Sequence, residues 1–447
     1  MSLPVLADEI LVQICEIFTE NQSPGFFSGQ NRRTLLALSR CSHWLNSLVT
    51  PMLYRNFLQT DRRTTNLFIE RVLDEPGLAK YVTSFCASDP DVNHSERCWD
   101  LDTITFDRVR VPIEVAFGLE PRSEDWFPES LTHPLAAWDI ATAVILVLLP
   151  NLEEIQIPSY CNSPRIDWVV RQSVLSENCL RKVNFVWMDS WDFKKENLKV
   201  SNIIPLLRLG KVECAEFEHV ADVKDPRELP QPFTLDNLRS LCLIASNLDW
   251  SFSEILQRCP KLHSFISEDG QGQLDPSMIG TALSLVKTRL DNLSIKYTTD
   301  TWTPIPMGPI GPLLEFKALR VLEIDATALL WTVPAPGTLN DIERDQRKTR
   351  PYQKQLVTLL PESLEKLRII DCWNMSATVK QIRELLAVKG KALPLLKDIS
   401  LRFAAGGSRK ETKELEGPCR SAGIALHILW RWDVDGYVAQ LVKNGEL

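Results

Sequence analysis

The chain has 447 residues and a formal net charge of -8, with 44% hydrophobic and 24% charged residues. These proportions are ordinary for a globular protein, and the length predicts two or three domains or one module followed by repeats. The negative charge argues against general nucleic-acid binding. The apolar run nearest to membrane length, 135–150, contains Asp139 and is too short to span a bilayer. We therefore expect neither nucleic acid nor a membrane among the partners.

Helical patterns open the chain. Apolar residues at 6, 10, 11, 14, 17 and 18 fall on one face of a predicted helix. A second run, 32–49, places Leu35, Leu38 and Leu45 on one face, with Trp44 beside them. Two or three helices in fewer than about sixty residues bury little surface alone, so their apolar faces need a partner.

Three short motifs follow one another in this stretch, namely Leu6–Leu11, Leu35–Trp44 and Pro51–Tyr54. In this order they resemble an F-box, although Ala7 stands at the family's usual Pro and segment 19–31 is longer than usual. The resemblance implies docking on the Skp adaptor, and through it on the cullin, of an SCF (Skp–cullin–F-box) ubiquitin ligase. The surface that it assigns to adaptor binding and packing consists of Leu6, Ile10, Leu11, Ile14, Leu35, Leu38 and Trp44.

The next region connects these helices to the rest of the chain. A helix is expected at 63–74, ending before Pro76, and a short strand at 82–86. Residues 88–135 are rich in Asp, Glu, Arg and Pro and have no sustained period, so we expect a mobile surface segment there. Helical periodicity resumes at 136–149.

A Leu-x-x-Leu-x-Leu pattern recurs from residue 152 onward, starting at residues 152, 180, 212, 238, 262, 290, 319, 364 and 396. Most intervals are close to the period of leucine-rich repeats, ~20–29 residues. Alternating strands and helices of this kind predict a horseshoe, with parallel strands on the concave side and helices on the convex side. Helical patterns fill several of the gaps, at 167–176, 251–258, 276–287 and 378–388.

The predicted fold class is α/β, a small N-terminal helical F-box followed by an irregular leucine-rich-repeat solenoid. A loop at 303–312 and an insert at 332–358 interrupt the array. A last strand is expected at 424–428 and a closing helix at 433–443. The predicted domains are the F-box at 1–58, a helical linker at 59–136 that contains the mobile segment, and the repeat domain with its C-terminal cap at 137–447.

The eleven cysteines contain no Cys-x-x-Cys pair. Several lie in apolar runs, as Cys242 does between Leu241 and Leu243, which favours buried reduced thiols over metal ligands. Their odd number, and an N-terminus that does not read as a secretory signal, predict a reducing compartment, the cytoplasm or the nucleus.

The sequence lacks the common catalytic and cofactor-binding motifs. The sequence has no nucleophile elbow, phosphate-binding loop or His-Glu-x-x-His pair, and its six histidines are dispersed. His263 lies in a predicted strand and is interpreted as structural. We expect no catalytic residue, no metal and no cofactor, and an enzyme is the least favoured class of protein.

A candidate substrate surface follows from strand geometry. The residue between the last two apolar positions of each repeat must face away from the core, because side chains alternate along a strand. This predicts a concave row of Gln156, Asn184, Glu216, Cys242, Ile266, Ser294, Glu323, Arg368 and Ser400.

The chemistry of the row is mixed, with only Arg368 as a fixed positive charge, so it favours a protein or peptide over a phosphate group. Trp187 and Trp373 are predicted as aromatic anchors at the strand ends, together with the polar members of the row. Trp250, Trp302 and Trp331 share one phase in the repeat, which favours a packing role. In the alternative interpretation the row is solvated, and the substrate binds the loops at 303–312 and 332–358.

These observations predict a substrate-recognition subunit of an SCF ubiquitin ligase, which holds a protein substrate near the ubiquitin-loading enzyme. Two alternatives remain open. One is an F-box scaffold that acts outside degradation, and the other is a plain leucine-rich interaction protein whose N-terminal helices cap the array.

Overall fold

The computed structural model describes residues 7–20, 29–87, 103–118, 134–158, 163–176, 179–189, 198–221, 233–246, 250–269, 276–297, 309–330, 355–372, 375–403 and 409–430. The fold is mixed α/β with a large parallel sheet. Within these ranges, no helix combines the length and apolar character needed to cross a bilayer. The chain divides into two compact units, Met1–Ala215 and Glu216–Leu447.

Three helices begin the first unit: α1 (Asp8–Glu20), α2 (Gly29–Ser39) and α3 (His43–Arg55). Ser42 caps α3, since its side chain accepts a hydrogen bond from the Leu45 backbone N–H at 3.1 Å. The three helices confirm the helical patterns of the N-terminal stretch. They meet around a small buried cluster of Cys15, Leu35 and Val49, against which Leu38, Leu48, Met52 and Leu53 pack.

The first unit continues into a parallel set of strands in the order β1-β2-β3-β4. The strands are β1 (Asn56–Gln59), β2 (Ser84–Ala87), β3 (Glu154–Ile157) and β4 (Phe185–Met188), with the short β5 (Leu198–Lys199) after them. Between them lie α4 (Arg62–Asp74), η2 (Leu78–Tyr81), α5 (Thr103–Phe117), α7 (Pro134–Leu148), α8 (Pro164–Ser176) and α9 (Val200–Leu207).

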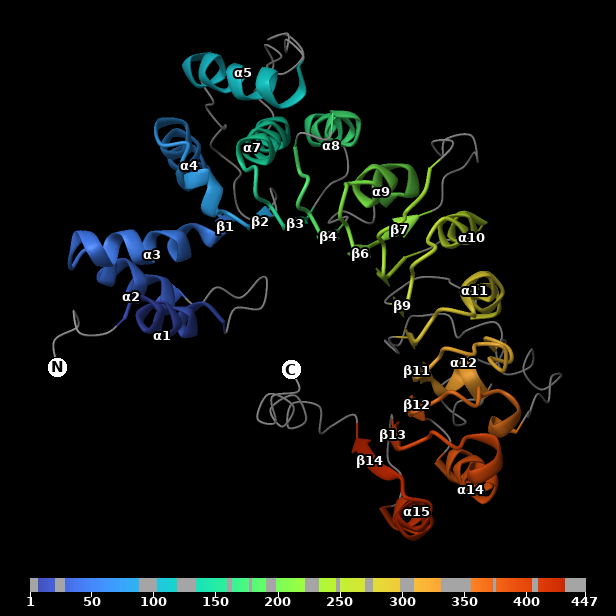
Figure 1. Cartoon of the computed structure of the whole chain (residues 1–447). Helices are drawn as coiled ribbons and strands as arrows, with labels where there is room; N and C mark the ends of the chain where they lie inside the picture. The colour runs from blue at the N-terminus through green and yellow to red at the C-terminus, as the bar shows by residue number, and fades with distance from the viewer. Residues whose placement is uncertain are drawn as a thin grey trace. The chain divides into compact units, whose positions relative to one another are not determined.

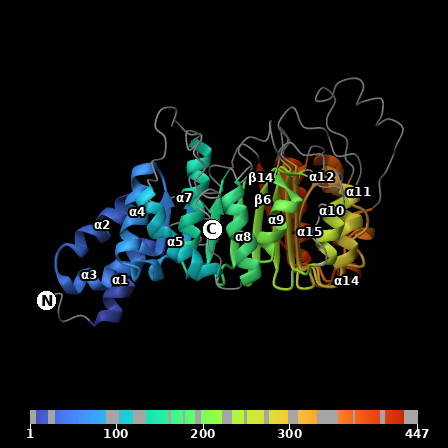
Figure 2. The ribbon, with the colours of Figure 1, turned by 90° about the horizontal axis from the view of Figure 1, so that it is seen from above.

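Consecutive strands are also neighbours in the second unit, in the order β8-β9-β10-β11-β12-β13-β14. Figure 1 shows α10, α11, α12, α14 and α15 on one side of these strands, and Figure 2 shows the same helices from above. The strands are β6 (Cys214–Glu218) at the division between the units, β7 (Val220–Ala221), β8 (Ser240–Ile244), β9 (Ser264–Asp269), β10 (Asn292–Tyr297), β11 (Val321–Asp325), β12 (Lys366–Cys372), β13 (Asp398–Phe403) and β14 (Ala425–Trp430). The helices are α10 (Trp250–Gln257), α11 (Pro276–Leu283), η4 (Ser284–Val286), α12 (Ala326–Leu330), η5 (Leu356–Thr358), α14 (Met375–Ala392) and α15 (Arg409–Ser421).

The recurring apolar pattern accounts for the core of the second unit. In each clear copy the first leucine and the two aliphatic residues of the strand are almost fully buried on the helix side, as Leu319, Leu322 and Ile324 are. Full burial of such a side chain contributes ~1.5–3 kcal/mol relative to exposure. Each strand therefore adds its own share of core, and stacking neighbours extends that core along the sheet.

Glycine is needed at one position of this packing. Gly280 of α11 lies so close to Ile310 that an added Cβ would overlap the backbone oxygen of Ile310. The Ile310 N–H in turn donates to the Ala328 carbonyl at 2.8 Å, which ties this segment to α12. Any larger residue at position 280 must push the helix away from that segment.

The structure corrects part of the interpretation of 88–135. Residues 103–117 form α5, whose Val109 and Ile113 are buried, and whose Phe117 packs edge-on against Trp168 with ring centroids 5.2 Å apart. The many polar residues and Pro112 obscured the helical period. The rest of that segment, 88–102 and 119–133, lies outside the described residues.

The division into units groups the N-terminal helices with the first strands, and the place of His263 differs from expectation. The contact-based division falls after Ala215, so α1–α3 belong to the same unit as β1–β4, into which α3 runs directly. His263 precedes β9 and is exposed instead of lying inside the strand. Outside the described residues lie the predicted closing helix, most of both inserts, Trp302, Trp331 and the side chain of Trp250.

Candidate functional site

We call the side of the second unit's strands that lies opposite the helices the open face. Neighbouring strands place one side chain each in a continuous row across this face. Their register aligns Cys242, Ile266, Ser294, Glu323, Arg368, Ser400 and His427. The register of the predicted row is as expected from Cys242 to Ser400, although Ser294 and Ser400 are themselves buried, and the last strand adds His427. Glu216 lies on β6 between the buried Ala215 and Phe217, which places it on the same side.

The first unit corrects one member of the predicted row. Gln156 of β3 pairs with Trp187 of β4, not with Asn184. Asn184 is exposed and precedes the strand, because Val186 and Met188 supply the buried positions of β4. Leu180 satisfied the apolar pattern three residues too early. Trp187 therefore occupies the row position itself, and Trp373 lies outside the described residues.

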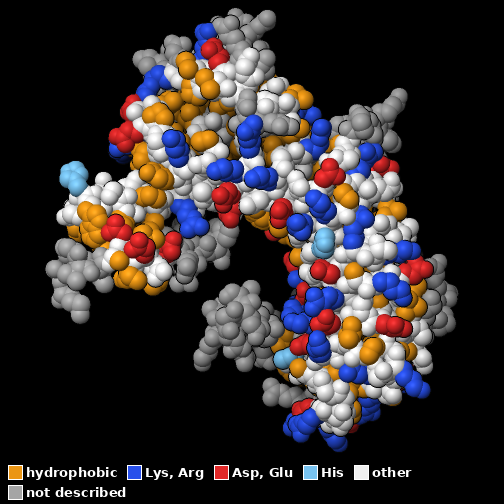
Figure 3. Space-filling model, viewed as in Figure 1, with side chains coloured by type: hydrophobic (Ala, Val, Ile, Leu, Met, Phe, Trp, Pro, Cys, Tyr) orange, Lys and Arg blue, Asp and Glu red, His pale blue; other side chains and the backbone are white. Residues whose placement is uncertain are grey.

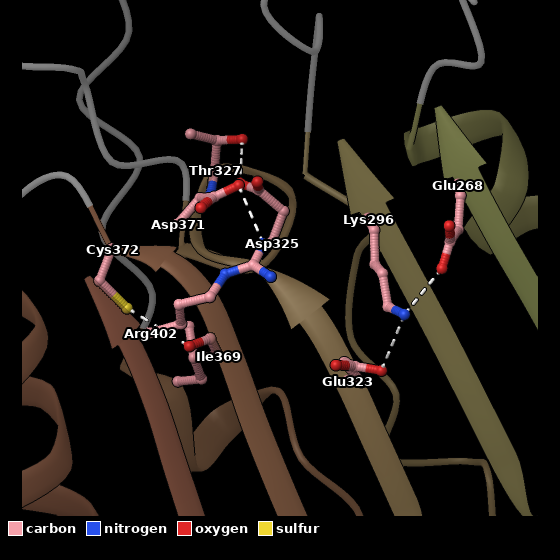
Figure 4. A network of polar contacts seen from close by, with 9 residues as sticks. All are labelled: Glu268, Lys296, Glu323, Asp325, Thr327, Ile369, Asp371, Cys372 and Arg402. Carbon is pink, nitrogen blue, oxygen red and sulfur yellow. Dashed lines mark hydrogen bonds and ion pairs between the residues drawn. The ribbon is translucent and has the colours of Figure 1, made fainter. Parts of the chain in front are cut away.

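A chain of ion pairs crosses three neighbouring strands of the open face (Figure 4). The Lys296 Nζ lies 2.7 Å from Glu268 Oε1 and 3.4 Å from Glu323 Oε2. The hydroxyl of Ser294 donates to Glu323 Oε2 at 3.1 Å. Partial burial lowers the pKa of Lys296, but the hydrogen bond to Glu268 and the charge of Glu323 outweigh it and raise that pKa above its ordinary value. Lys296 therefore stays charged and is shared by two carboxylates.

A buried polar cluster lies beside this chain, at the ends of β11, β12 and β13 (Figure 4). Asp325 Oδ1 accepts hydrogen bonds from the backbone N–H and the hydroxyl of Thr327, at 2.7 and 2.6 Å. Burial raises the pKa of Asp325 to about 7. Asp371 sits at an irregularity of β12 with a φ of 50°, and its Oδ2 lies 3.3 Å from Arg402 Nη2.

Several atoms of this cluster lack hydrogen bonds. Asp325 Oδ2, Asp371 Oδ1 and Arg402 Nε are buried without a partner in the part of the chain that the structure describes. The cluster holds two acids against one guanidinium, which is consistent with the raised pKa of Asp325. Such an arrangement fixes strand ends at the cost of desolvation, and it contains no nucleophile paired with a base.

A shallow hollow of about 520 Å³ marks the edge where the strands begin. Its walls include His263, Arg289, Asp291 and Lys317, with the ion pair between Arg320 Nε and Glu365 Oε1 at 2.7 Å. Figure 3 shows charged side chains of both signs intermingled along this part of the molecule. Because Arg320 is paired with Glu365 and Arg289 Nη2 donates to the Cys259 carbonyl at 2.7 Å, the hollow is better suited to scaffolding than to capture of one small ion.

The N-terminal helices offer a surface of different chemistry. Ile10, Ile14 and Ile17 of α1 are 44%, 42% and 59% exposed, and we call these three residues the α1 stripe. Leu36 of α2 is also exposed. Their spacing places them on one face of the helix. In Figure 3 hydrophobic side chains gather over the region of these helices.

The residues assigned to the adaptor surface thus take different positions. Ile10 and Ile14 are open to solvent, whereas Leu11 and Leu35 are buried within the helices. Leu38 and Trp44 are partly buried, with Leu38 packed on the cluster around Val49. Leu6 lies outside the described residues.

Sequence reasoning missed several residues that the structure brings to these surfaces. Glu268 and Lys296 each lie two residues after a row position, so extending the alternation by one step would have found them. Ile17 was visible in the helical period but not included among the contacts. His427 follows from the predicted last strand by the same rule as the other row members.

Neither protein-family models nor curated protein sequences match this chain, so its function has to be inferred from these surfaces.

Proposed function

We propose that the chain is the substrate-recognition subunit of an SCF ubiquitin ligase, with α1–α3 as an F-box that docks on the Skp adaptor and the strand array as a leucine-rich-repeat solenoid that binds a protein substrate. The α1 stripe carries the proposal. Three isoleucines on one face of a helix are exposed, while the adjoining face of the helix holds the buried Leu11 and Cys15. Such a face is typical of a docking surface.

The strand array supports the second half of the proposal. Consecutive strands are parallel neighbours, each with a buried leucine ladder, and the helices of the second unit lie on one side. The opposite side presents polar and charged groups in register. A repeat solenoid uses such an extended open surface for binding.

The mechanism requires no bond to be made or broken by this chain. By holding the substrate on the same molecule that docks on the ligase, it would raise the effective concentration of substrate lysines at the site of ubiquitin transfer. No cofactor or metal enters this account, and the polar clusters of the open face serve recognition.

The adaptor contact is tested by charging the α1 stripe. In the double variant with Ile10→Asp and Ile14→Asp, a negative charge would have to be buried at each of two anchor positions. We expect adaptor affinity to fall at least a hundredfold, since truncating one such anchor costs ~2 kcal/mol or more. Calorimetric titration with purified Skp adaptor measures this.

Two controls make the titration decisive. Leu175→Asp changes an apolar side chain of α8 that is 75% exposed, and it should leave adaptor affinity unchanged. Circular dichroism checks that the stripe variant keeps its helices. Leu11 is unsuitable for this test, because its side chain is 4% exposed and a charge there would unfold the N-terminal helices. A folded stripe variant with undiminished affinity would refute the F-box assignment.

A second candidate is a plain interaction module in which α1–α3 cap the strand array. It is favoured by the direct passage of α3 into β1 and by the grouping of these helices with β1–β4 in one unit. In that case the native chain would show no measurable affinity for the adaptor, and the α1 stripe would be an ordinary solvent-exposed surface.

A further inference from the structure

Charge is unevenly distributed across the open face. Among the described side chains that are not buried, β6 to β11 carry four carboxylates and one ammonium. We call these residues the acidic half: Glu216, Glu218, Glu268, Glu323 and Lys296. The remaining strands, β12 to β14, carry three cationic groups, one carboxylate and one imidazole. We call these the basic half: Lys366, Arg368, Arg402, Asp398 and His427.

The separation is hidden when the central row is taken alone. That row contains Glu323 next to Arg368 and looks mixed, but the positions two residues before and after it give each half an excess of one sign, although Lys296 and Asp398 carry the opposite sign. Glu268 and Lys296 join the acidic half from one side, and Lys366 and Arg402 join the basic half. The two halves meet between β11 and β12.

The acidic half retains its negative field despite Lys296. That ammonium is already bound between Glu268 and Glu323, so one cation serves two carboxylates. Burial, together with the nearby charges of Glu216 and Glu268, raises the pKa of the Cys242 thiol to about 12 and so disfavours a thiolate. Ile244 and Ile266, both partly exposed on the same strands, add apolar contact area.

On the basic half, Asp398 lies 3.3 Å from His427 Nε2 and so engages an imidazole instead of a guanidinium. Arg368 is exposed at the centre of this half. The carboxylate of Asp371, which faces Arg402, is itself buried. Within the described ranges no ion pair involves Lys366 or Arg368, so both can meet an approaching acidic group.

We propose that the open face binds a protein segment with a basic block next to an acidic block, the basic block over β6–β11 and the acidic block over β12–β14. This deepens the proposed function by naming the class of substrate, and it rests on that function only for the role of substrate. Seven strand spacings of ~4.8 Å give a face ~34 Å wide, which an extended segment of about ten residues crosses.

Charge complementarity selects this occupant over uniformly charged ones. A phosphopeptide or other uniformly anionic segment would meet repulsion over the acidic half, and a uniformly basic segment would meet it over β12–β14. Juxtaposed like charges suppress wrong partners, while complementary ones set the register and speed association. A segment with both blocks satisfies the whole face.

The test uses synthetic peptides of about ten residues, matched to the width of the face. In one peptide the lysines and glutamates form two separate blocks, and in the other the same residues alternate. Fluorescence anisotropy with the full-length chain, without adaptor and at low ionic strength, should show at least tenfold tighter binding of the block peptide. Equal affinity of the two peptides, or no binding of either, would overturn the proposal.

Conservative charge removals localise the binding. Glu216→Gln and Arg368→Gln should each weaken the block peptide about threefold, as expected for partly solvated charge pairs. Matched controls on the helix side, Glu416→Gln of α15 and Lys391→Gln of α14, should leave its affinity unchanged. Equal effects of the face and control variants would show a general charge effect and contradict the proposal.

The peptide test is independent of the adaptor test. The α1-stripe variant should lose the adaptor and keep the block peptide, since the stripe and the open face belong to different units. Loss of peptide selectivity with adaptor binding intact would overturn only this inference. Absence of adaptor binding with peptide selectivity intact would overturn only the ligase assignment.

Discussion

The α1 stripe and the open face differ in the kind of recognition that they allow. The stripe is a short apolar surface on a helix, with Ile10, Ile14 and Ile17 exposed beside the buried Leu11. The open face is a broad polar surface whose charges are held in register by neighbouring strands. Apolar burial gives affinity for one constant partner, whereas ordered charge gives selectivity among variable ones. This difference in chemistry supports the proposed bridging role.

The largest expected effect separates the two faces of α1. Leu11→Ala removes a side chain that is 4% exposed, and it should destabilise the N-terminal helices by ~2–5 kcal/mol. Ile14→Ala, on the exposed face, should change stability by less than about 0.5 kcal/mol. Urea unfolding followed by circular dichroism compares them. Similar losses for both variants would mean that the stripe is covered within the chain.

The next effect concerns the scaffold behind the open face. Gly280→Ala forces α11 away from Ile310 and should destabilise the second unit by ~1–3 kcal/mol. Gly390→Ala in α14 is a matched control, because an added Cβ there meets no atom within 4 Å. Hydrogen exchange should accelerate in α11 and β10 and stay unchanged in α1. Unaltered exchange in α11 would contradict the described packing.

Two buried aspartates sharpen the comparison between the units. Asp139 in α7 accepts hydrogen bonds from the backbone N–H groups of Arg165 and Ile166, both at 3.0 Å, and so caps α8. Burial raises its pKa to about 6 even though these two bonds and the charge of Arg165 act to lower it. Asp325 has one oxygen bonded to Thr327 and the other without a partner among the described residues, and burial raises its pKa to about 7.

Replacement by Asn should therefore act oppositely at the two sites. Asp139→Asn turns an amide N–H₂ toward a backbone N–H. It should lower the free energy of unfolding by about 1–2 kcal/mol. Asp325→Asn removes a buried charge at pH 8 and should be neutral or stabilising there. Thermal unfolding at pH 8 compares the variants. Equal destabilisation would contradict the difference in hydrogen bonding.

The pH dependence has a definite sign. Each carboxyl has a folded-state pKa above its ordinary value of 3.8, so the folded protein binds more protons than the unfolded one. The stability contribution is fully present below about pH 4 and is lost as pH rises through about 6 for Asp139 and about 7 for Asp325. Asp325→Asn should flatten the dependence of the free energy of unfolding on pH between pH 4 and 7. An unchanged dependence would contradict the raised pKa of Asp325.

The smallest effect is that of salt. Raising ionic strength from low to physiological values should weaken the block peptide severalfold, because charges on the open face are partly solvated and screened over a Debye length of ~8 Å. Adaptor affinity should change less than twofold, since the α1 stripe carries no charge. Titrations with the peptide and with the adaptor in the two buffers measure the two affinities. A larger effect of salt on the adaptor than on the peptide would contradict the assignment of apolar chemistry to the stripe and charged chemistry to the open face.

The helix side of the array was predictable from sequence, and the open face only in part. Leucines such as Leu241 and Leu322 recur with a period because every repeat needs the same buried contacts. At β4, Leu180 matched the pattern by chance and shifted the predicted register by three residues. β1 and β2 went unrecognised as array members, since Gln59 and Ala87 occupy positions where an aliphatic residue was sought.

Charge separation on the open face could not be read from single repeats. The ion pairs of Lys296 join residues 28 positions apart on one side and 27 on the other, so they depend on strand register. The cluster of Asp325, Asp371 and Arg402 depends in addition on the irregularity in β12, which no apolar pattern reveals. The helical period predicted the apolar face of α1. Which of its residues are buried and which are exposed depends on the packing of α2 and α3.

The two-surface account is tested most directly by reconstitution of the full-length chain with purified Skp adaptor, cullin and labelled block peptide. Size-exclusion chromatography should show one complex that contains all four components. The double variant Ile10→Asp and Ile14→Asp should release adaptor and cullin together while still carrying the peptide. A native chain that carries the peptide but recruits no cullin would contradict the account.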